Sequence, residues 1–464
     1  QKEATVPPPI LFGFLRKLEV QLGWTPLPIP DLEQFPLHKV LRKTSPQPAE
    51  APYEALAESI LKSPQWQVPF PYREKDVLFL QEAIDSNLRG QSCQFSLLPE
   101  LFYRNQHAYL LGLVEGEETT FPFAVPFVNE EIGIRPRAFL VGQQALLKLF
   151  AFTRSYFLVP TEDPVGLVAA LLQLMPDKDP AQLIINLGYQ EWGKILIQQQ
   201  AEKVLRDSGE MLDYTAGVRG MVMIVFSHPS SAIVFKAIRD TGKPPKTIRA
   251  EQVVERYQFV VGQDRVGRFA DAQLFENWSF PKRLFAPDLL EELLEESRST
   301  LSESEDTICF HKILTERRMT PLDIFVRTEQ SPLPERMIEE YGRAITEIAM
   351  SNIFPGDLLL KNFGVTDDHK VVFYDYDEVC RLSDCRFRKL PEQTFSGDSI
   401  LSHVGPEDVF PEEFRHFLLP EGPLREHLEN HYEHLFNTEF WNRWKQFHLD
   451  GGFIDLQPYD PSLD

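Results

Sequence analysis

A segment near residue 360 most constrains this chain, because it spaces three polar side chains along a predicted hairpin. Asp357 precedes Asn362 by five positions, and Asp375 follows the apolar run 371–373. Phosphoryl transfer needs a divalent cation held by carboxylate and amide oxygens, and one carboxylate beside the attacking hydroxyl group. The segment supplies all of these groups, so we expect it to form the centre of a phosphoryl-transfer site.

The order and spacing of these residues match a protein-kinase catalytic loop and the metal-binding strand that follows it. We interpret Asp357 as the catalytic base, and Asn362 and Asp375 as ligands of Mg²⁺ (or Mn²⁺). Lys361 is placed to neutralise charge on the transferred phosphoryl group. Asp377 shares one side of a strand with Asp375, so either carboxylate could be the ligand and the other a base, although the interval from Asn362 favours Asp375 as the ligand.

A lysine in an apolar strand lies upstream of this segment. Arg219–Ser227 and Ala232–Ile238 read as the two strands of a hairpin, and the second strand carries Lys236. Kinases place the lysine that grips nucleotide phosphates on such a strand. The approach Ala216-Gly217-Val218-Arg219-Gly220 contains glycines that let backbone N–H groups reach phosphate oxygens. An edge lysine that snorkels to solvent and an ordinary tight turn are the alternatives.

Two further segments fit the same plan. Phe310–Leu314 predicts a strand, and Glu316 and Met319 follow it where a kinase hinge would bind adenine, although an ordinary polar connector fits equally well. Glu335–Ala349 predicts an amphipathic helix that leads to the catalytic loop. Its single apolar stripe consists of Met337, Tyr341, Ala344, Ile345 and Ile348.

Composition limits the classes of partner. A net charge of −22 argues against nucleic acid or an anionic membrane as the main partner, and no apolar run is long enough to span a bilayer. The start of the chain does not resemble a signal peptide. The four cysteines (Cys93, Cys309, Cys380 and Cys385) lack paired-ligand spacing and predict reduced thiols in the cytoplasm. The eleven histidines include no His-Glu-x-x-His pattern, so no zinc site is predicted.

Periodicity places the remaining elements. Helices are predicted at Ile10–Leu22, Tyr53–Leu61, Glu74–Leu88, Leu97–Val114, Pro164–Leu174, Pro180–Leu205, Ala250–Val261, Asp271–Asn277 and Ala286–Ser297. Residues 121–157 contain strand-like runs, and residues 390–464 are expected to be mostly helical.

Over roughly residues 97 to 450 the chain resembles the bacterial isocitrate dehydrogenase kinase/phosphatase family. The motifs that carry the resemblance are Leu101-Phe102-Tyr103-Arg104-Asn105, Arg154-Ser155-Tyr156-Phe157, Gly217–Met223, Val234-Phe235-Lys236, Asp264–Arg268, Phe275-Glu276-Asn277, Glu316–Met319, Asn352–Glu378 and Pro406–Phe414.

The resemblance implies an α+β protein with a bilobal protein-kinase-like domain (residues 207–464) after a mainly helical regulatory domain (residues 1–206). It implies Mg-ATP-dependent phosphorylation of a serine of isocitrate dehydrogenase, and removal of that phosphate, switching flux between the citric acid cycle and the glyoxylate bypass. Thr215–Met221 and Lys236 would bind ATP or ADP, and Asp271 would be an active-site residue.

The N-terminal part looks shorter than the family's, so regulation by AMP or a metabolite, usual in the family, is an open expectation. Three alternatives stay open beside the bifunctional enzyme. They are a family member with one activity only, a nucleotide-binding scaffold, and a small-molecule kinase.

Overall fold

The computed structural model describes residues 36–37, 40–43, 52–62, 66–88, 93–116, 120–151, 156–243, 246, 248–389, 404–454, 456–457 and 459. The chain forms two compact units, Gln1–Gln198 together with Gln457–Asp464, and Gln199–Leu456. The helix predicted at Ile10–Leu22 lies outside the described residues, as do Arg154 and Ser155 of one motif and the segment 390–403. None of the described helices is both long and apolar enough to cross a membrane.

The first unit is built around an antiparallel sheet. Its strand order is β1 (Arg42–Lys43), β2 (Cys93–Arg104), β3 (His107–Gly116), β4 (Thr120–Glu130) and β5 (Gly133–Pro136), and β6 (Leu140–Val141) pairs with β4. The domain is therefore mixed helix and sheet, and the prediction of a mainly helical domain is not confirmed.

The helix predicted over Leu97–Val114 is wrong, because these residues form most of β2 and β3. Leu101 pairs with Leu110 in the antiparallel register, and Asn105 makes the turn with a φ of 53°. Both faces of these strands are buried, so apolar residues fill neighbouring positions and imitate helical spacing. Asparagine tolerates the left-handed backbone conformation that this tight turn requires.

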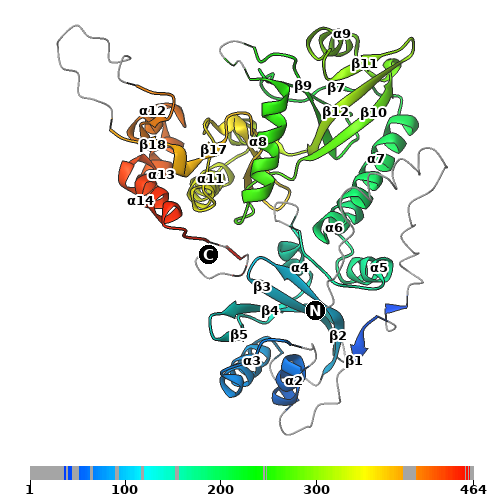
Figure 1. Ribbon diagram of the computed structural model, residues 1–464, viewed down its shortest axis with the longest axis vertical. Coiled ribbons are helices and arrows are strands. Elements are labelled where there is room, and N and C mark those ends of the chain that lie inside the picture. Colours follow the sequence, from blue (N-terminus) through cyan, green and yellow to red (C-terminus); the bar gives the residue numbers. More distant parts are fainter. Residues whose placement is uncertain are drawn as a thin grey trace. The chain divides into compact units, whose positions relative to one another are not determined.

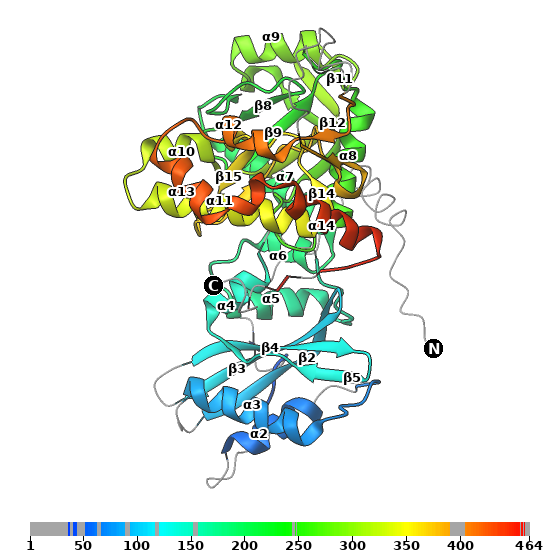
Figure 2. The same ribbon diagram turned by 90° about the vertical axis from the view of Figure 1, so that its left-hand side faces the viewer.

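Helices cover both faces of this sheet. α2 (Pro52–Lys62) and α3 (Arg73–Leu88) share a core with one face, and α4 (Gln143–Leu149), α5 (Pro164–Leu174) and α6 (Pro180–Asn186) share a core with the other. Figure 2 shows α2 and α3 on one side of the strands and α4 and α5 on the opposite side. The single helix predicted at Pro180–Leu205 is two helices, α6 and α7 (Gln190–Asp207), separated at Gly188 with a φ of +83°.

The end of the chain contributes to the first unit. The hydroxyl group of Tyr109 in β3 donates a hydrogen bond to Oε1 of Gln457 at 2.5 Å, and the Gln457 side chain is buried. Tyr459 packs beside the core formed by β2, β3 and α5. Residues from both ends of the described sequence therefore complete one core.

The second unit also contains an antiparallel sheet. Its order is β10 (Gln273–Pro281), β12 (Thr307–Arg317), β9 (Ile233–Ile238), β8 (Met223–Ser227) and β7 (Asp213–Tyr214), and β11 (Leu301–Glu303) pairs with β12. The predicted hairpin is confirmed, because β8 pairs with β9 and Val225 lies opposite Lys236. Figure 1 shows α8 (Ala250–Gln263) beside this sheet, and α9 (Pro287–Glu296) follows β10 after η2 (Lys282–Leu284).

The helix predicted over Asp271–Asn277 is wrong, because β10 begins at Gln273. Phe275, Trp278 and Phe280 are buried aromatic residues of this strand. Asn277 has a φ of +54°, which interrupts the alternation between Phe275 and Trp278. That irregularity hides the period of two that would have indicated a strand.

The rest of the second unit is mostly helical. α10 (Leu322–Thr328) and α11 (Leu333–Met350) precede the segment that was predicted as the catalytic loop, and the predicted apolar stripe of α11 is buried. β13 (Thr320–Pro321) precedes α10. Short elements follow α11: β14 (Ile353–Phe354), η3 (Leu360–Asn362), β15 (Phe363–Val365), β16 (Val371–Phe373), β17 (Cys380–Arg381), η4 (Leu382–Asp384), β18 (Arg386–Phe387) and β19 (Asp408–Val409). The last elements are η6 (Pro411–Glu413), α12 (Phe414–Phe417), α13 (Pro423–His431), η7 (Glu433–Phe436) and α14 (Thr438–Leu449).

Candidate functional site

A cavity of about 870 Å³ lies within the second unit, between the β7–β12 sheet and the loops around η3 and β16. Fourteen of the sixteen predicted site residues line it. They are Thr215, Ala216, Gly217, Val218, Arg219, Gly220, Met221, Lys236, Glu316, Met319, Lys361 and Asn362, joined by Asp375 and Asp377. Only Asp357 and Asp271 of the predicted residues fall outside this lining.

Lys236 is held in the sheet by a buried ion pair. Its Nζ lies 2.8 Å from the carboxylate oxygens of Glu316, 2.8 Å from the carbonyl oxygen of Tyr374 and 3.4 Å from the hydroxyl group of Tyr257. Lys236 lies opposite Leu314, two residues from Glu316 on the same face of β12. Burial raises the pKa of Glu316, although the charge of Lys236 opposes that rise.

This geometry changes the interpretation of Glu316. The sequence predicts Glu316 after a strand, in a hinge or an ordinary connector, but β12 extends to Arg317 and includes it. Its carboxylate forms an ion pair with Lys236 on the neighbouring strand β9. Met319 does follow the strand, and its side chain packs over Gly364, where an added Cβ would lie 2.9 Å from Met319 Cβ.

The glycine-bearing segment forms one wall of the cavity. Gly217 has a φ of +116°, which favours glycine. At Gly220 an added Cβ would lie 2.6 Å from the carbonyl oxygen of Met223, so a larger residue does not fit. The guanidinium of Arg219 lies 3.9 Å from the centre of the Tyr214 ring. The backbone can therefore approach a ligand closely along Thr215–Met221.

Carboxylate and amide groups gather on the opposite wall. Asn362 is buried, and its side-chain amide donates to the carbonyl oxygen of Asp357 at 3.2 Å. The backbone N–H of Tyr374 donates to the carbonyl oxygen of Asn362 at 3.1 Å, which joins η3 to the segment carrying Asp375. Loss of hydration, followed by the neighbouring charge of Asp377, raises the pKa of Asp375 to about 7. Two neighbouring carboxylates repel each other unless a proton or a cation lies between them.

Lys246 is a cavity residue that the sequence analysis missed. Its Nζ lies 2.8 Å from Oδ2 of Asp377 and 3.2 Å from Oε1 of Glu378. Burial disfavours its charge, but the ion pair with Asp377 prevails and raises the pKa of Lys246. It lies in a loop between β9 and α8, where neither strand nor helix periodicity marks it. Lys243 and Lys246 both follow Lys236 within ten residues, and the sequence does not distinguish between them.

The two remaining predicted residues lie near the cavity lining. Oδ1 of Asp357 accepts a hydrogen bond from the backbone N–H of Leu359 at 3.0 Å, and the preceding Gly356 has a φ of +79°. Asp271 accepts a hydrogen bond from Gln273 at 2.6 Å. The backbone N–H of Ala270 donates to the carbonyl oxygen of Phe373 at 3.0 Å, so the segment before Asp271 runs beside β16.

A buried arginine fixes β16 against α11. Arg268 forms ion pairs with Glu347 and, at 2.8 Å, with Glu340, and it donates to the carbonyl oxygen of Val371 at 3.0 Å. Burial opposes its charge, but the two glutamates prevail and raise the pKa of Arg268. These bonds hold the strand that ends two residues before Asp375.

Comparison with known proteins gives the family. Residues 210–461 match the isocitrate dehydrogenase kinase/phosphatase (AceK) kinase domain, and residues 30–209 match the regulatory domain of the same family. The resemblance therefore starts well before residue 97, where the sequence analysis placed its beginning.

Curated relatives named isocitrate dehydrogenase kinase/phosphatase align over most of the chain. The relative from Anaeromyxobacter sp. (strain Fw109-5) is 38% identical over 421 residues, which is 88% of this chain and 73% of the relative. The relative from Photorhabdus laumondii is 37% identical, over 87% of this chain and 70% of the relative. The relative from Methylibium petroleiphilum is 38% identical, over 92% of this chain and 71% of the relative. The chain belongs to the isocitrate dehydrogenase kinase/phosphatase family.

Proposed function

We propose that this chain is a Mg-ATP-dependent protein kinase that phosphorylates a serine of isocitrate dehydrogenase and also removes that phosphate. One observation carries the proposal. The Lys236–Glu316 ion pair and the group Asn362, Asp375 and Asp377 line the same cavity. Kinases require a lysine for the phosphates and an amide–carboxylate pair for the metal in one cleft. The sheet and the helical part around this cavity would be the two lobes of a kinase-like domain.

The donor set fits Mg²⁺. Asn362 supplies an amide oxygen, and Asp375 and Asp377 supply carboxylates, which are the ligands that hard divalent cations prefer. The raised pKa of Asp375 supports this assignment, because a bound cation relieves the repulsion that otherwise favours its protonated form. The cation would neutralise charge on the phosphates of ATP or ADP.

The chain's own residues divide the remaining work. Backbone N–H groups of Thr215–Met221 would contact the phosphates, and Lys236 would hold them against the sheet. Asp357 would accept the proton of the substrate hydroxyl group, and Lys361 would offset charge on the transferred group. Met319 follows β12 at the edge of the cavity, where it would contact the adenine.

Asp377 and Asp271 are proposed to assist in the active site. The ion pair with Lys246 would hold the carboxylate of Asp377 in the cavity that both residues line, where Asp377 would serve as the base or the supporting group beside Asp375. Removal of phosphate would use the same site when ADP is bound. We further propose a cytoplasmic location and a regulatory role for the first unit, with AMP or another metabolite as the effector.

The direct test follows labelled phosphate. The chain is incubated with labelled ATP and isocitrate dehydrogenase, and ADP is then added to measure release. Asp357→Ala should retain nucleotide binding and lose on the order of 10²–10⁴ in the transfer rate. Full phosphorylation by that variant would refute the role of Asp357. Transfer without release would support a kinase with one activity. Nucleotide binding without transfer would support a scaffold, and transfer to small molecules alone would support a small-molecule kinase.

A further inference from the structure

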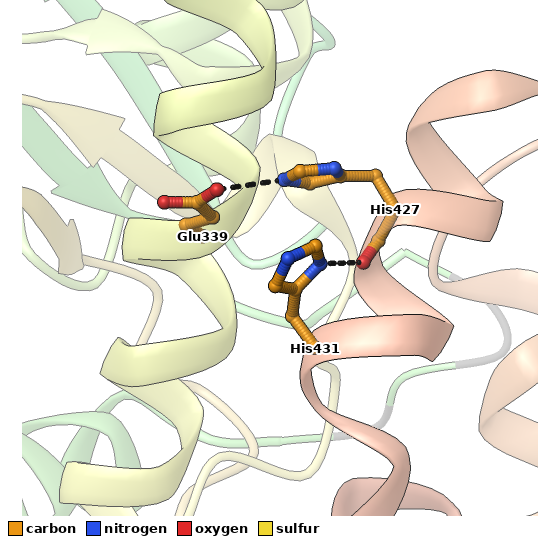
Figure 3. A group of neighbouring side chains, drawn as sticks. All are labelled: Glu339, His427 and His431. Atoms are coloured by element: carbon orange, nitrogen blue, oxygen red, sulfur yellow. Dashed lines mark hydrogen bonds and ion pairs between the residues drawn. The ribbon is translucent and has the colours of Figure 1, made fainter.

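Two histidines and a glutamate form a cluster outside the cavity. Glu339 lies on α11, and His427 and His431 lie on α13. One ligand atom from each side chain lies within 4.8 Å of the others. Figure 3 shows the three side chains facing one another between the two helices. Nothing in the proposed phosphoryl-transfer chemistry uses these residues.

The spacing on α13 suits metal binding. Residues four apart lie on the same face of a helix, so His427 and His431 both face α11, and their ring centres are 4.2 Å apart. Nε2 of His427 lies 2.9 Å from Oε1 of Glu339. Metal bonds of about 2.0–2.1 Å in a tetrahedron place ligand atoms roughly 3.3 Å apart. The Glu339–His427 pair is therefore already close to the required separation.

A hydrogen bond prepares the third ligand. Nδ1 of His431 lies 2.8 Å from the carbonyl oxygen of His427 and donates a proton to it. That bond fixes the tautomer in which Nε2 keeps its lone pair, as is usual for metal-bound histidines. The side chain of His431 is exposed, so a small rotation toward Glu339 meets little steric resistance.

We propose that Glu339, His427 and His431 bind one Zn²⁺ ion, with water at the fourth position. Two imidazoles and one carboxylate are a known ligand set for zinc with one open position. Imidazole nitrogen disfavours Mg²⁺, which takes oxygen ligands, so this site is chemically distinct from the one beside Asp375. The ion would tie α13 to α11, the helix that leads to Asp357.

The test measures metal binding to the full chain after treatment with a chelator. Zn²⁺ stoichiometry is measured with saturating Mg²⁺ present, so that the carboxylates of the cavity are occupied. The unaltered chain should bind one equivalent more than His431→Gln and than His427→Gln/His431→Gln. His416→Gln, which removes an exposed histidine on α12, is the matched control and should bind as the unaltered chain does.

Cobalt distinguishes the ligands. Co²⁺ bound to the unaltered chain should give visible bands of a tetrahedral site without the near-ultraviolet band of a cobalt–thiolate bond. Those bands should disappear in His431→Gln, which changes an exposed side chain. Zn²⁺ should raise the unfolding temperature of the unaltered chain and of His416→Gln, but not that of His431→Gln. The proposal would be overturned if all variants bound the same number of Zn²⁺ ions. It would also be overturned by a cobalt–thiolate band that persists in the variants, because that band would assign the metal to Cys380 and Cys385.

Discussion

The buried ion pair between Lys236 and Glu316 allows a quantitative prediction. Their charged groups are 2.8 Å apart, and the side chains are 7% and 1% exposed. Glu316→Leu removes the carboxylate paired with the ammonium group, whose other hydrogen bonds among the described residues are to the neutral Tyr374 carbonyl and Tyr257 hydroxyl groups. Removing one partner of such a pair costs about 3–5 kcal/mol of unfolding free energy, because the other charge stays buried without compensation.

The double variant Lys236→Met/Glu316→Leu should recover much of this loss, because it removes both buried charges. Each single variant should lower the unfolding temperature by roughly 6–20 °C, from the usual relation between free energy and melting temperature for a unit of this size. All three variants should lose phosphoryl transfer.

The assay is thermal unfolding combined with amide hydrogen exchange. The chain has two units, so exchange in β9 and β12 is needed to assign a transition to the second one. Glu303→Gln is the control, because its ion pair with Lys282 is half-exposed and should be worth less than about 1 kcal/mol. If the double variant is destabilised by the sum of the two single effects, the two charges do not depend on each other and the reasoning fails.

Three further predictions concern the cavity. The folded chain keeps a proton on Asp375 up to about pH 7, whereas an unfolded aspartate loses it near pH 3.8, so the contribution of Asp375 to stability falls as pH rises between these values. Mg²⁺-dependent nucleotide binding should strengthen as pH rises through 7, because the deprotonated carboxylate binds the cation. Asp375→Asn should not show this pH dependence. Lys246→Ala should lower the phosphoryl-transfer rate by on the order of 10²-fold, because Asp377 loses the partner that positions it. Lys246→Arg should restore part of the rate, and an unchanged rate in Lys246→Ala would contradict this role. Gly356→Ala should cost about 1–3 kcal/mol by denaturation, because its φ is +79° and the new Cβ would lie 2.6 Å from the carbonyl oxygen of Glu378; a stability equal to the unaltered chain would exclude this strain.

The parts of the site with strong local signals were predictable from sequence. Lys236 was placed on the correct strand because the apolar runs on both sides of the turn are short and bounded by His228-Pro229. The apolar stripe of α11 gave its position to within two residues at either end. Each signal is contained in one segment, so no knowledge of distant contacts was needed.

The errors arose where tertiary contacts decide the structure. The strands β2 and β3 are buried on both faces, so their sequence lacks the alternation that identifies a half-buried strand. The partnership of Glu316 with Lys236 depends on the pairing of β12 with β9, which joins segments 80 residues apart. Lys246 meets Asp377 across 131 residues, and no local pattern records that contact.

The bond between Tyr109 and Gln457 has a consequence for how the chain is made. The first unit contains strands synthesised before the second unit and a glutamine synthesised after it. Its core therefore stays incomplete during translation until the second unit has emerged from the ribosome. A deletion after residue 456 should consequently loosen β3 in the early-made unit, while the later-made catalytic unit keeps its own core.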